Sequence, residues 1–475
     1  MLTRRRFSAL ASASALTPMR AASLDAGASS KAIVEVLDEH VGIVRPDFIG
    51  LSYESTQLYD PNHFSPDNLP LVDAFRRLSR HGVLRLGGNL SDCSVWKSDA
   101  GDFMTPKLRA AVEHGRTYWE WRLCSPSVDA RRNGAITPSA IAKLRAFLDA
   151  TGWRVIYGLN FGSGNAARAG DEGRHAVDIL GDKLIALQVG NEVDFYAGNP
   201  FFRSTSYDFA EYYAGYTEFA GAVRKSRPRA PFAGPDTAAN MEWVDRFGRL
   251  TSDAVLLTSH YYAMGPAKDP AMNAARLLNS NSQLERRLDI GQRDAARANI
   301  PFRITEANSC YGGGKPGVSN AYASTLWSAD FLLQAATLGC AGIDLHGGGD
   351  GLYTPIESRG TGEVSVRPVY YGMQFAQLFA GAQLQLCRTT PTSKLRAYAG
   401  RRNADFFLAL INKSATAISL EISWPEATGR PLSRAVRLAG TSLDAKTNIS
   451  WTEVPAELPQ FAELPAYGAA FLQWT

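Results

Sequence analysis

The chain has 475 residues, which is enough for a large hydrophobic core and more than one domain. Hydrophobic residues make up 45% and charged residues 20% of the sequence, as in ordinary globular proteins. The formal net charge is only +4 and no basic run stands out, which argues against nucleic acid as the main partner. No internal stretch is long and uncharged enough for a membrane helix, so we expect no membrane insertion.

The N-terminus has the pattern of an export signal. Residues 1–6 read MLTRRR, small and apolar residues follow over 7–16, and Ala21, Ala22 and Ser23 offer a cleavage site. The first residues also resemble the twin-arginine export pattern. We therefore expect residues 1–25 to be a signal of a bacterial protein that is periplasmic or extracellular. An untidy disordered tail is the alternative.

A strand–helix alternation begins at Phe48, after a strand-like segment within residues 26–46. Eight apolar, β-rich runs are predicted strands: 48–53, 83–86, 154–159, 184–189, 231–234, 254–259, 302–305 and 342–345. Helical periodicity lies between them, over 69–80, 138–150, 207–227, 281–298 and 322–338, with Asn68, Thr137 and Ser206 as expected N-caps. This α/β alternation predicts a (β/α)8 TIM barrel over residues 47–383.

The pattern of apolar and polar residues changes after residue 384. Short alternating runs separated by turn residues replace the long helical patterns, over 395–399, 405–412, 418–424, 434–438 and 469–474. They predict a C-terminal β-sandwich domain over residues 384–475. The segment 26–46 is a candidate strand of the same sandwich, because the barrel starts only at Phe48.

Five cysteines are present, and none has metal-ligand spacing. They are Cys93, Cys124, Cys310, Cys340 and Cys387. One or two disulfides could form in an oxidising compartment, but we favour buried free thiols. Nothing in the sequence implies a metal or an organic cofactor.

Two glutamates follow predicted strands. Glu192 comes after the fourth strand, in the string QVGNE, and Glu306 ends the seventh, in FRITE. Catalytic residues of such barrels lie at the C-terminal ends of strands, and cleavage of a glycosidic bond uses a pair of carboxyl groups. One glutamate alone would be read as a rim carboxylate paired with an arginine such as Arg303. The two together predict a glycosidase site, in which Asn191 binds a sugar hydroxyl.

Several strings resemble glycoside hydrolase family 79, the β-glucuronidase and heparanase family of retaining clan A enzymes. The strings are VLRLGG (83–88), VGNE (189–192), GPD (234–236), SHYY (259–262), TE (305–306), YGG (311–313) and DGLY (350–353). The similarity covers about Phe48 to Gly381, with a family-like β-domain after it. Val193 departs from the family pattern, since many clan members have proline after the acid/base glutamate.

The resemblance implies a role for each matching residue. Glu192 would be the acid/base and Glu306 the nucleophile, while Glu54 would grip sugar hydroxyls. Other positions are also expected to bind substrate: Asn89 as a further hydroxyl ligand, Tyr262, and Tyr311, Gly312, Gly313 and Tyr353 as ligands of the substrate's C5 carboxylate. Tyr261 and Tyr262 follow the sixth strand, next to the seventh, so we expect one of the two to hydrogen-bond Glu306 and lower its pKa. Glycine N–H groups and phenols are suitable anion donors.

The leading hypothesis is therefore an exported, monomeric, retaining exo-β-glucuronidase that acts on glucuronide-containing carbohydrates. A heparanase-like endo-enzyme is the first alternative, although the chain has no long excisable linker and no clustered basic runs. The second alternative is a carbohydrate-binding protein without activity, which the presence of both glutamates disfavours.

Overall fold

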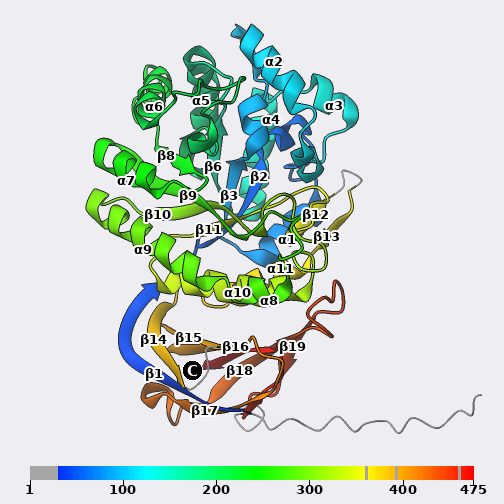
Figure 1. Cartoon of the computed structure of the whole chain (residues 1–475), viewed down its shortest axis with the longest axis vertical. Helices are drawn as coiled ribbons and strands as arrows, with labels where there is room; N and C mark the ends of the chain where they lie inside the picture. The colour runs from blue at the N-terminus through cyan, green and yellow to red at the C-terminus, as the bar shows by residue number, and fades with distance from the viewer. Residues whose placement is uncertain (1–29, 359–361, 391–393, 458–461) are drawn as a thin grey trace, which may run out of the picture.

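The computed structural model describes residues 30–358, 362–390, 394–457 and 462–475. A barrel of parallel strands surrounded by helices forms one part of the molecule, and a mostly antiparallel sheet forms the other (Figure 1). The expected export signal, residues 1–25, lies outside the described residues. None of the helices in the described ranges is long and apolar enough to cross a membrane.

Eight parallel strands close into the predicted barrel. Its strands are β2 (Ile49–Glu54), β3 (Val83–Gly87), β6 (Arg154–Leu159), β7 (Leu184–Val189), β8 (Phe232–Thr237), β9 (Ala254–Met264), β10 (Phe302–Cys310) and β11 (Ile343–His346). Their order around the barrel is β10-β11-β2-β3-β6-β7-β8-β9, and β9 pairs with β10. Each strand overlaps one predicted run. However, β9 and β10 continue well past their predicted ends, into polar residues on the barrel rim.

Helices cover the outside of the barrel (Figure 1). They are α1 (Leu69–Leu78), α2 (Pro106–Gly115), α3 (Val128–Asn133), α4 (Pro138–Thr151), α5 (Ala166–Leu180), α6 (Phe209–Arg224), α7 (Met241–Leu250), α8 (Ala274–Leu278), α9 (Asn281–Ala298), α10 (Tyr322–Thr337) and α11 (Pro368–Gln377). Thr137 caps α4 as predicted, since its hydroxyl oxygen accepts from the Ala140 N–H. Asn68 occupies the N-cap position of α1 as predicted, although its side chain makes no cap hydrogen bond. The third prediction is wrong, because Asp208, not Ser206, caps α6.

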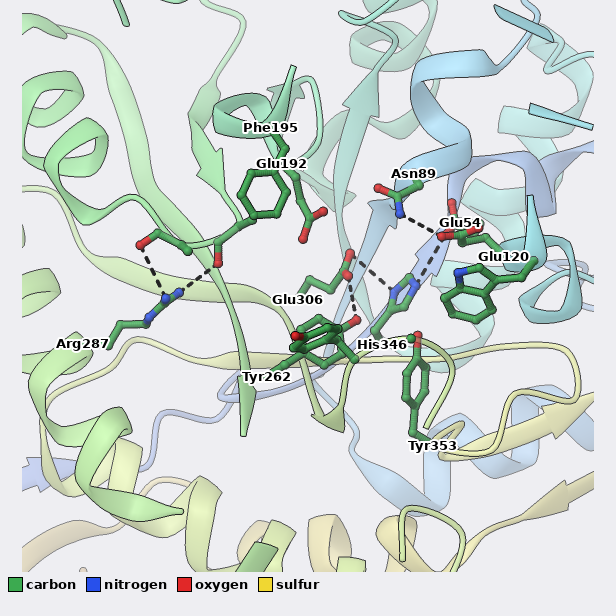
Figure 2. Close-up of a pocket in the computed structure, with 15 residues that line it drawn as sticks. Glu54, Asn89, Glu120, Glu192, Phe195, Tyr262, Arg287, Glu306, His346 and Tyr353 are labelled. Carbon is green, nitrogen blue, oxygen red and sulfur yellow. Dashed lines mark hydrogen bonds and ion pairs between the residues drawn. The ribbon is translucent and has the colours of Figure 1, made fainter. Parts of the chain in front are cut away.

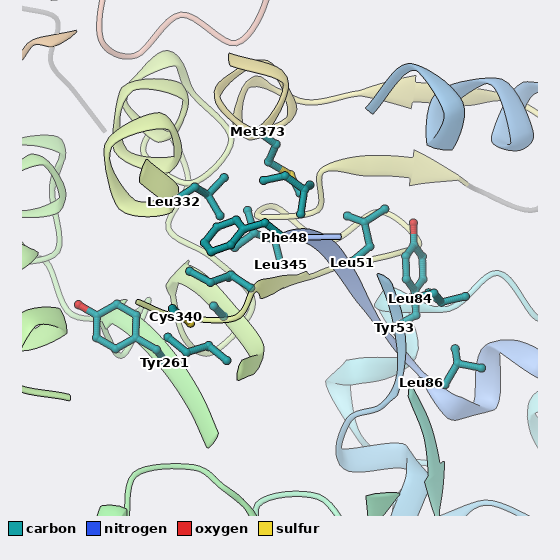
Figure 3. Packing of buried hydrophobic residues seen from close by; sticks show 14 of the residues in the cluster. Phe48, Leu51, Tyr53, Leu84, Leu86, Tyr261, Leu332, Cys340, Leu345 and Met373 are labelled. Carbon is teal, nitrogen blue, oxygen red and sulfur yellow. The ribbon is translucent and has the colours of Figure 1, made fainter. Parts of the chain in front are cut away.

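Alternation along the strands separates the two sides of the barrel wall. On β3, Leu84 and Leu86 pack outward in the apolar layer between strands and helices, part of which Figure 3 shows. Val83 belongs instead to a small inner cluster with Ile156 and residues of neighbouring strands. Arg85 lies two residues after Val83 and is fully buried, so this guanidinium takes an inward position nearer the C-terminal end of the strand.

The second part of the molecule is a nine-stranded sheet with the order β19-β18-β21-β16-β15-β14-β1-β17-β20. Its strands are β1 (Ser30–Ile43), β14 (Gln383–Thr390), β15 (Leu395–Arg402), β16 (Asp405–Asn412), β17 (Ile418–Ser423), β18 (Leu432–Ala439), β19 (Ser450–Val454), β20 (Glu463–Leu464) and β21 (Ala469–Trp474). Strand β1 is antiparallel to β14 and parallel to β17. Every second residue of β16 and β21 faces a separate apolar core, as expected for a sandwich.

A buried ion network joins the barrel helices to this sheet. Asp330 on α10 accepts from the Lys413 ammonium at 2.7 Å and from the Arg396 guanidinium at 3.1 Å. The Tyr398 hydroxyl also donates to Asp330. Burial would raise the pKa of Asp330, but the two cations and these hydrogen bonds lower it to about 2. The network therefore ties the barrel to the strands that follow it.

Candidate active site

A cavity of about 530 Å³ opens among the loops at the C-terminal ends of the barrel strands, and both predicted glutamates line it (Figure 2). One side of the cavity, here called the acidic arm, is formed by Glu54, Asn89, Glu120, His346 and Tyr353. The other side, the arginine arm, is formed by Phe195, Ala238, Ala239 and Arg287. Figure 2 shows Glu192 and Glu306 between the two arms. This is the position expected for catalytic residues in a barrel of this kind.

Glu306 lies on β10 at an irregularity in the sheet. Ile304 pairs with Ser259 and Glu306 pairs with the next residue, His260, so Thr305 is an extra residue in β10. Such a bulge changes the direction of the side chains that follow it. The Thr305 hydroxyl donates to Asp236 at 2.6 Å, which anchors the bulge inside the barrel. The local irregularity thus helps to position the Glu306 carboxylate.

The Glu306 carboxylate is surrounded by donors. The Tyr262 hydroxyl donates to Oε1 at 2.8 Å, so Tyr262 is the one of the two expected tyrosines that bonds Glu306, and the Arg85 guanidinium donates to Oε2 at 2.8 Å. His346 Nδ1 lies 3.7 Å from the same Oε2. Burial would raise the pKa of Glu306, but the charges of His346, His260 and Arg85 and the Tyr262 hydrogen bond lower it to about 2. Glu306 is therefore ionised at neutral pH.

The Arg85 guanidinium forms hydrogen bonds to several residues of the site. Besides Glu306, its guanidinium donates to Asn191 Oδ1 at 2.8 Å, to Gln188 Oε1 at 3.0 Å and to Asp236 Oδ2 at 2.5 Å. Planar guanidinium geometry suits such a multidentate position. Asn191, predicted to bind a sugar hydroxyl, lies close to Glu192 and also donates to Asn89 Oδ1 at 3.1 Å. Arg85 thus links β3, β7, β8 and β10 beneath the cavity floor.

Glu192 follows β7 in a left-handed backbone conformation, with φ of 48°. This conformation costs a non-glycine residue roughly 1–2 kcal/mol, and it is found mainly where the surroundings impose it. Here the loop is held by the Tyr196 hydroxyl, which accepts from the Asn191 N–H at 3.2 Å and donates to Asp92 Oδ2 at 2.5 Å. The Glu192 side chain is 21% exposed, against 8% for Glu306. Of the two carboxyl groups, Glu192 is thus the more open to solvent.

His260 connects Glu192 to the buried network. Its Nδ1 lies 3.2 Å from Glu192 Oε1, and its Nε2 lies 3.1 Å from Asp236 Oδ1. Burial would lower the pKa of His260, but the charges of Asp236 and Glu306 and the contacts with Asp236 and Glu192 raise it to about 10. The ring is therefore a cation at neutral pH that donates to Glu192.

Glu192, His260 and Glu306 each bring one potential ligand atom to within 4.8 Å of the others. The carboxyl groups of the two glutamates thus face each other across one cavity. The predicted absence of a metal or cofactor stays a prediction.

The acidic arm presents polar groups to the cavity. Glu54 Oε2 accepts from the Leu90 N–H at 2.8 Å, whereas its buried Oε1 has no hydrogen-bond partner among the described residues. His346 Nε2 lies 3.5 Å from that Oε1. Asn89 donates to Glu120 Oε1 at 2.9 Å. A buried acceptor without a partner beside a cavity is suited to a ligand hydroxyl.

Glu120 was not predicted from the sequence. Burial, and then the neighbouring charge of Glu54, raise its pKa to about 7. It belongs to the segment Trp119–Leu123, a short 3₁₀ helix, and Trp119 also lines the cavity. A side chain at Gly313 would lie only 3.3 Å from the Trp119 ring. The loop that carries Gly313 therefore closes against Trp119 at the edge of the cavity.

Three tyrosines form the wall below Glu306. The Tyr262 ring centroid lies 6.4 Å from that of Tyr311 and 6.1 Å from that of Tyr353. Tyr311, Gly312 and Tyr353 line the cavity as predicted, whereas Gly313 lies behind them against Trp119. Burial raises the pKa of the Tyr353 phenol well above its ordinary value, so the hydroxyl stays protonated. Whether these groups bind a carboxylate stays a prediction.

The sequence did not reveal several residues that surround the glutamates. Arg85, Asp236 and His346 belong to the charged network around them, and Phe195 and Arg287 line the cavity. The strings that contain Arg85 and Asp236 were noted only for their resemblance to a family. Arg303, the alternative partner of a rim glutamate, instead pairs with Asp344 at 2.6 Å. A polar residue inside an otherwise apolar strand was the available signal for Arg85.

No protein-family model matches the chain. A β-glucuronidase from Aspergillus niger is 26% identical to it over an alignment of 374 residues that covers 72% of this chain and 64% of that protein. A β-glucuronidase from Neurospora crassa is 25% identical over an alignment of 352 residues that covers 66% of this chain and 58% of that protein. The matched region thus spans less than two thirds of the length of these curated relatives.

Solved structures confirm the fold. A 4-O-α-L-rhamnosyl-β-D-glucuronidase from Fusarium oxysporum superposes with a TM-score of 0.69 and 18% identity, over 93% of this chain and 99% of that one. A family 51 α-L-arabinofuranosidase from Bifidobacterium longum gives a TM-score of 0.66 and 15% identity, over 94% of this chain and 100% of that one. The chain therefore has the (β/α)8 barrel and C-terminal β-sandwich of these structures.

Proposed function

We propose that the chain is a retaining exo-β-glucuronidase similar to glycoside hydrolase family 79. The observation that carries the proposal is the pairing of an ionised, buried Glu306 with the more exposed Glu192, with ligand-type oxygens within 4.8 Å. Retaining glycosidases place their carboxyl groups about 5–5.5 Å apart, whereas inverting enzymes need about 6.5–9.5 Å to admit a water molecule. The two β-glucuronidase relatives support the substrate class.

In the first step, the Glu306 carboxylate attacks the anomeric carbon and the bond from that carbon to the leaving oxygen breaks. Protonated Glu192 transfers its proton to the leaving oxygen. Arg85 and Tyr262 hold the two Glu306 oxygens, so the carboxylate needs little reorganisation before attack. The products are a glucuronyl ester of Glu306 and the free alcohol.

In the second step, Glu192 is ionised and removes a proton from water, whose oxygen attacks the same anomeric carbon. The ester bond to Glu306 breaks, and glucuronic acid leaves with its original anomeric configuration. His260 Nδ1, which lies 3.2 Å from Glu192 Oε1, holds the Glu192 side chain in place during both steps. One carboxyl group thus acts as acid and then as base.

The sugar ring would occupy the acidic arm, where Glu54, Asn89 and Glu120 offer partners for hydroxyl groups. The C5 carboxylate would meet the hydroxyls of Tyr311 and Tyr353 and the N–H of Gly312. Exo action is proposed because the loops of Trp119 and Gly313 meet at the edge of this part of the cavity. Export guided by residues 1–25 and a monomeric state belong to the same proposal.

The direct test compares 4-nitrophenyl β-glucuronide with the corresponding β-glucoside and α-arabinofuranoside. The glucuronide should have the highest kcat/KM, and Glu306→Gln should lower its turnover by at least about 10⁴-fold. Glu242→Gln, at an exposed position on α7, is the matched control. No turnover of any glycoside by the wild type would favour a binding protein, and internal cleavage of a glucuronate-containing oligosaccharide would favour the endo-enzyme.

A further inference from the structure

The arginine arm has no role in the proposed mechanism, although it forms a full side of the cavity. Its residues come from one arc of the barrel: Phe195 follows β7, Ala238 and Ala239 follow β8, and Arg287 lies on α9, after β9. The acidic arm comes from the opposite arc, around β11, β2 and β3. With the sugar in the acidic arm, a leaving group beside Glu192 extends toward the arginine arm (Figure 2).

Arg287 is a cation held in place by neutral groups. Its guanidinium donates to the backbone oxygen of His260, to that of Ala238 at 3.1 Å and, weakly, to that of Ala239 at 3.5 Å. Within the described residues, no carboxylate forms a direct ion pair with it. Carbonyl partners fix the position of a guanidinium but leave its charge uncompensated.

Asp194 is the carboxylate whose charge acts on Arg287 from a distance. Its hydrogen bonds go to backbone N–H groups instead. Its Oδ1 accepts from the Ala238 N–H at 2.7 Å, and its Oδ2 accepts from the N–H groups of Ala239 at 3.1 Å and Asn240 at 3.0 Å. Asp194 therefore stabilises the turn after β8. Burial lowers the pKa of Arg287, and the charges of Tyr261 and Asp194 oppose that shift.

Phe195 adds an apolar surface to the same arm. Its side chain is 64% exposed although it lies three residues after Glu192 at the mouth of the cavity. An aromatic face and a cation that line the same cavity are suited to a sugar ring or aryl group that carries an acidic substituent. A fixed positive charge at this point attracts an anionic group toward this side of the cavity.

We propose that Arg287 and Phe195 form a leaving-group subsite for an anionic group, such as a sugar that carries a carboxylate or a sulfate. The inference rests on the proposed glucuronidase function and names the leaving group that this function prefers. A charge-assisted hydrogen bond from Arg287 would raise kcat/KM for an anionic leaving group by about tenfold over its neutral counterpart.

The test uses glucuronides of N-acetylglucosamine in neutral and 6-O-sulfated forms, and of glucuronic acid and its neutral amide. The wild type should favour the anionic member of at least one pair by about tenfold, and which pair responds identifies sulfate or carboxylate. Arg287→Gln should bring that ratio close to one, and Arg287→Lys should keep part of the preference. Arg286→Gln, which removes an exposed arginine from the same helix, is the matched control and should keep the wild-type ratio.

Two results would overturn the subsite. Equal kcat/KM for both members of both pairs in the wild type would do so, and so would an anionic preference that survives in Arg287→Gln. A narrowed glucuronide-to-glucoside ratio in Arg287→Gln, measured with the neutral 4-nitrophenyl leaving group, would place Arg287 at the C5 carboxylate instead. Turnover of the neutral glucuronides tests the proposed glucuronidase function itself. If the enzyme hydrolysed them but showed no preference for anionic leaving groups, the subsite would be refuted and the glucuronidase function would stand.

Discussion

The Tyr262 hydroxyl donates a 2.8 Å hydrogen bond to Oε1 of Glu306. This bond comes from β9, the strand next to β10, and it reaches the carboxylate because β10 bulges at Thr305. The opposite oxygen is held by Arg85. The nucleophile of the proposed reaction is therefore fixed from two sides before any substrate arrives.

Tyr262→Phe should lower kcat/KM on an aryl glucuronide by roughly 10- to 100-fold, the value of a hydrogen bond to a charged group. It should also shift the acid limb of the pH profile to higher pH, because the lost bond helps to keep the pKa of Glu306 at about 2. Tyr261→Phe is the control, since that side chain bonds weakly to the Ser280 carbonyl oxygen at 3.4 Å. An unchanged acid limb would separate Tyr262 from the ionisation of Glu306.

Tyr353→Phe should narrow the ratio of kcat/KM between glucuronide and glucoside. The phenol is buried and protonated, and a glucoside offers it no carboxylate, so the glucuronide should lose about tenfold more than the glucoside. Paired 4-nitrophenyl substrates measure the ratio directly. Tyr371→Phe on α11, away from the cavity lining, should leave it unchanged. An equal loss of kcat/KM on both substrates would show that Tyr353 does not bind the C5 carboxylate.

Lys413→Met should destabilise the protein without changing kcat, because it removes one cation from the buried Asp330. Loss of one partner from a buried ion pair costs about 3–5 kcal/mol, and here Arg396 and Tyr398 remain to reduce that cost. The melting temperature should fall by several degrees at pH 7. Lys225→Met, at an exposed position, is the control and should melt like the wild type.

The same substitution carries a pH test. The pKa of Asp330 is lowered to about 2 in the folded protein, from an ordinary 3.8. Its ionised form therefore stabilises the fold above pH 3.8, and this contribution is lost as the pH falls toward 2. The gap in melting temperature between wild type and Lys413→Met should shrink over that range. A gap that widens in acid would contradict the assignment.

Much of the fold could be predicted from apolar runs, because each barrel strand is buried on both faces and reads as a short hydrophobic segment. Helix α5 was missed since its sequence, AARAGDEGRHAVDIL, is rich in glycine and charge. Gly173 shows the physical reason: a side chain there would lie 2.6 Å from Val223 on α6. Close helix packing, which the sequence does not display, overrides the low helix propensity of glycine.

Catalytic residues could be predicted where a reactive side chain directly follows a predicted strand. Glu192 and Glu306 met that condition, as did Tyr262. Arg85 did not, because one polar residue in VLRLGG has no visible partner until the barrel closes around it. Glu120 lies in the long segment that connects β3 to β6, and its neighbourhood in the sequence has no strand pattern. Its role depends on contacts across the cavity, which periodicity alone cannot reveal.

The central claim is a double displacement through Glu306, and the configuration of the first product tests it most directly. Proton NMR should follow 4-nitrophenyl β-glucuronide during the first turnovers, before mutarotation mixes the anomers. The account predicts that β-glucuronic acid appears first and the α-anomer only later. Initial release of α-glucuronic acid would show single displacement by water and contradict the assignment of Glu306 as nucleophile.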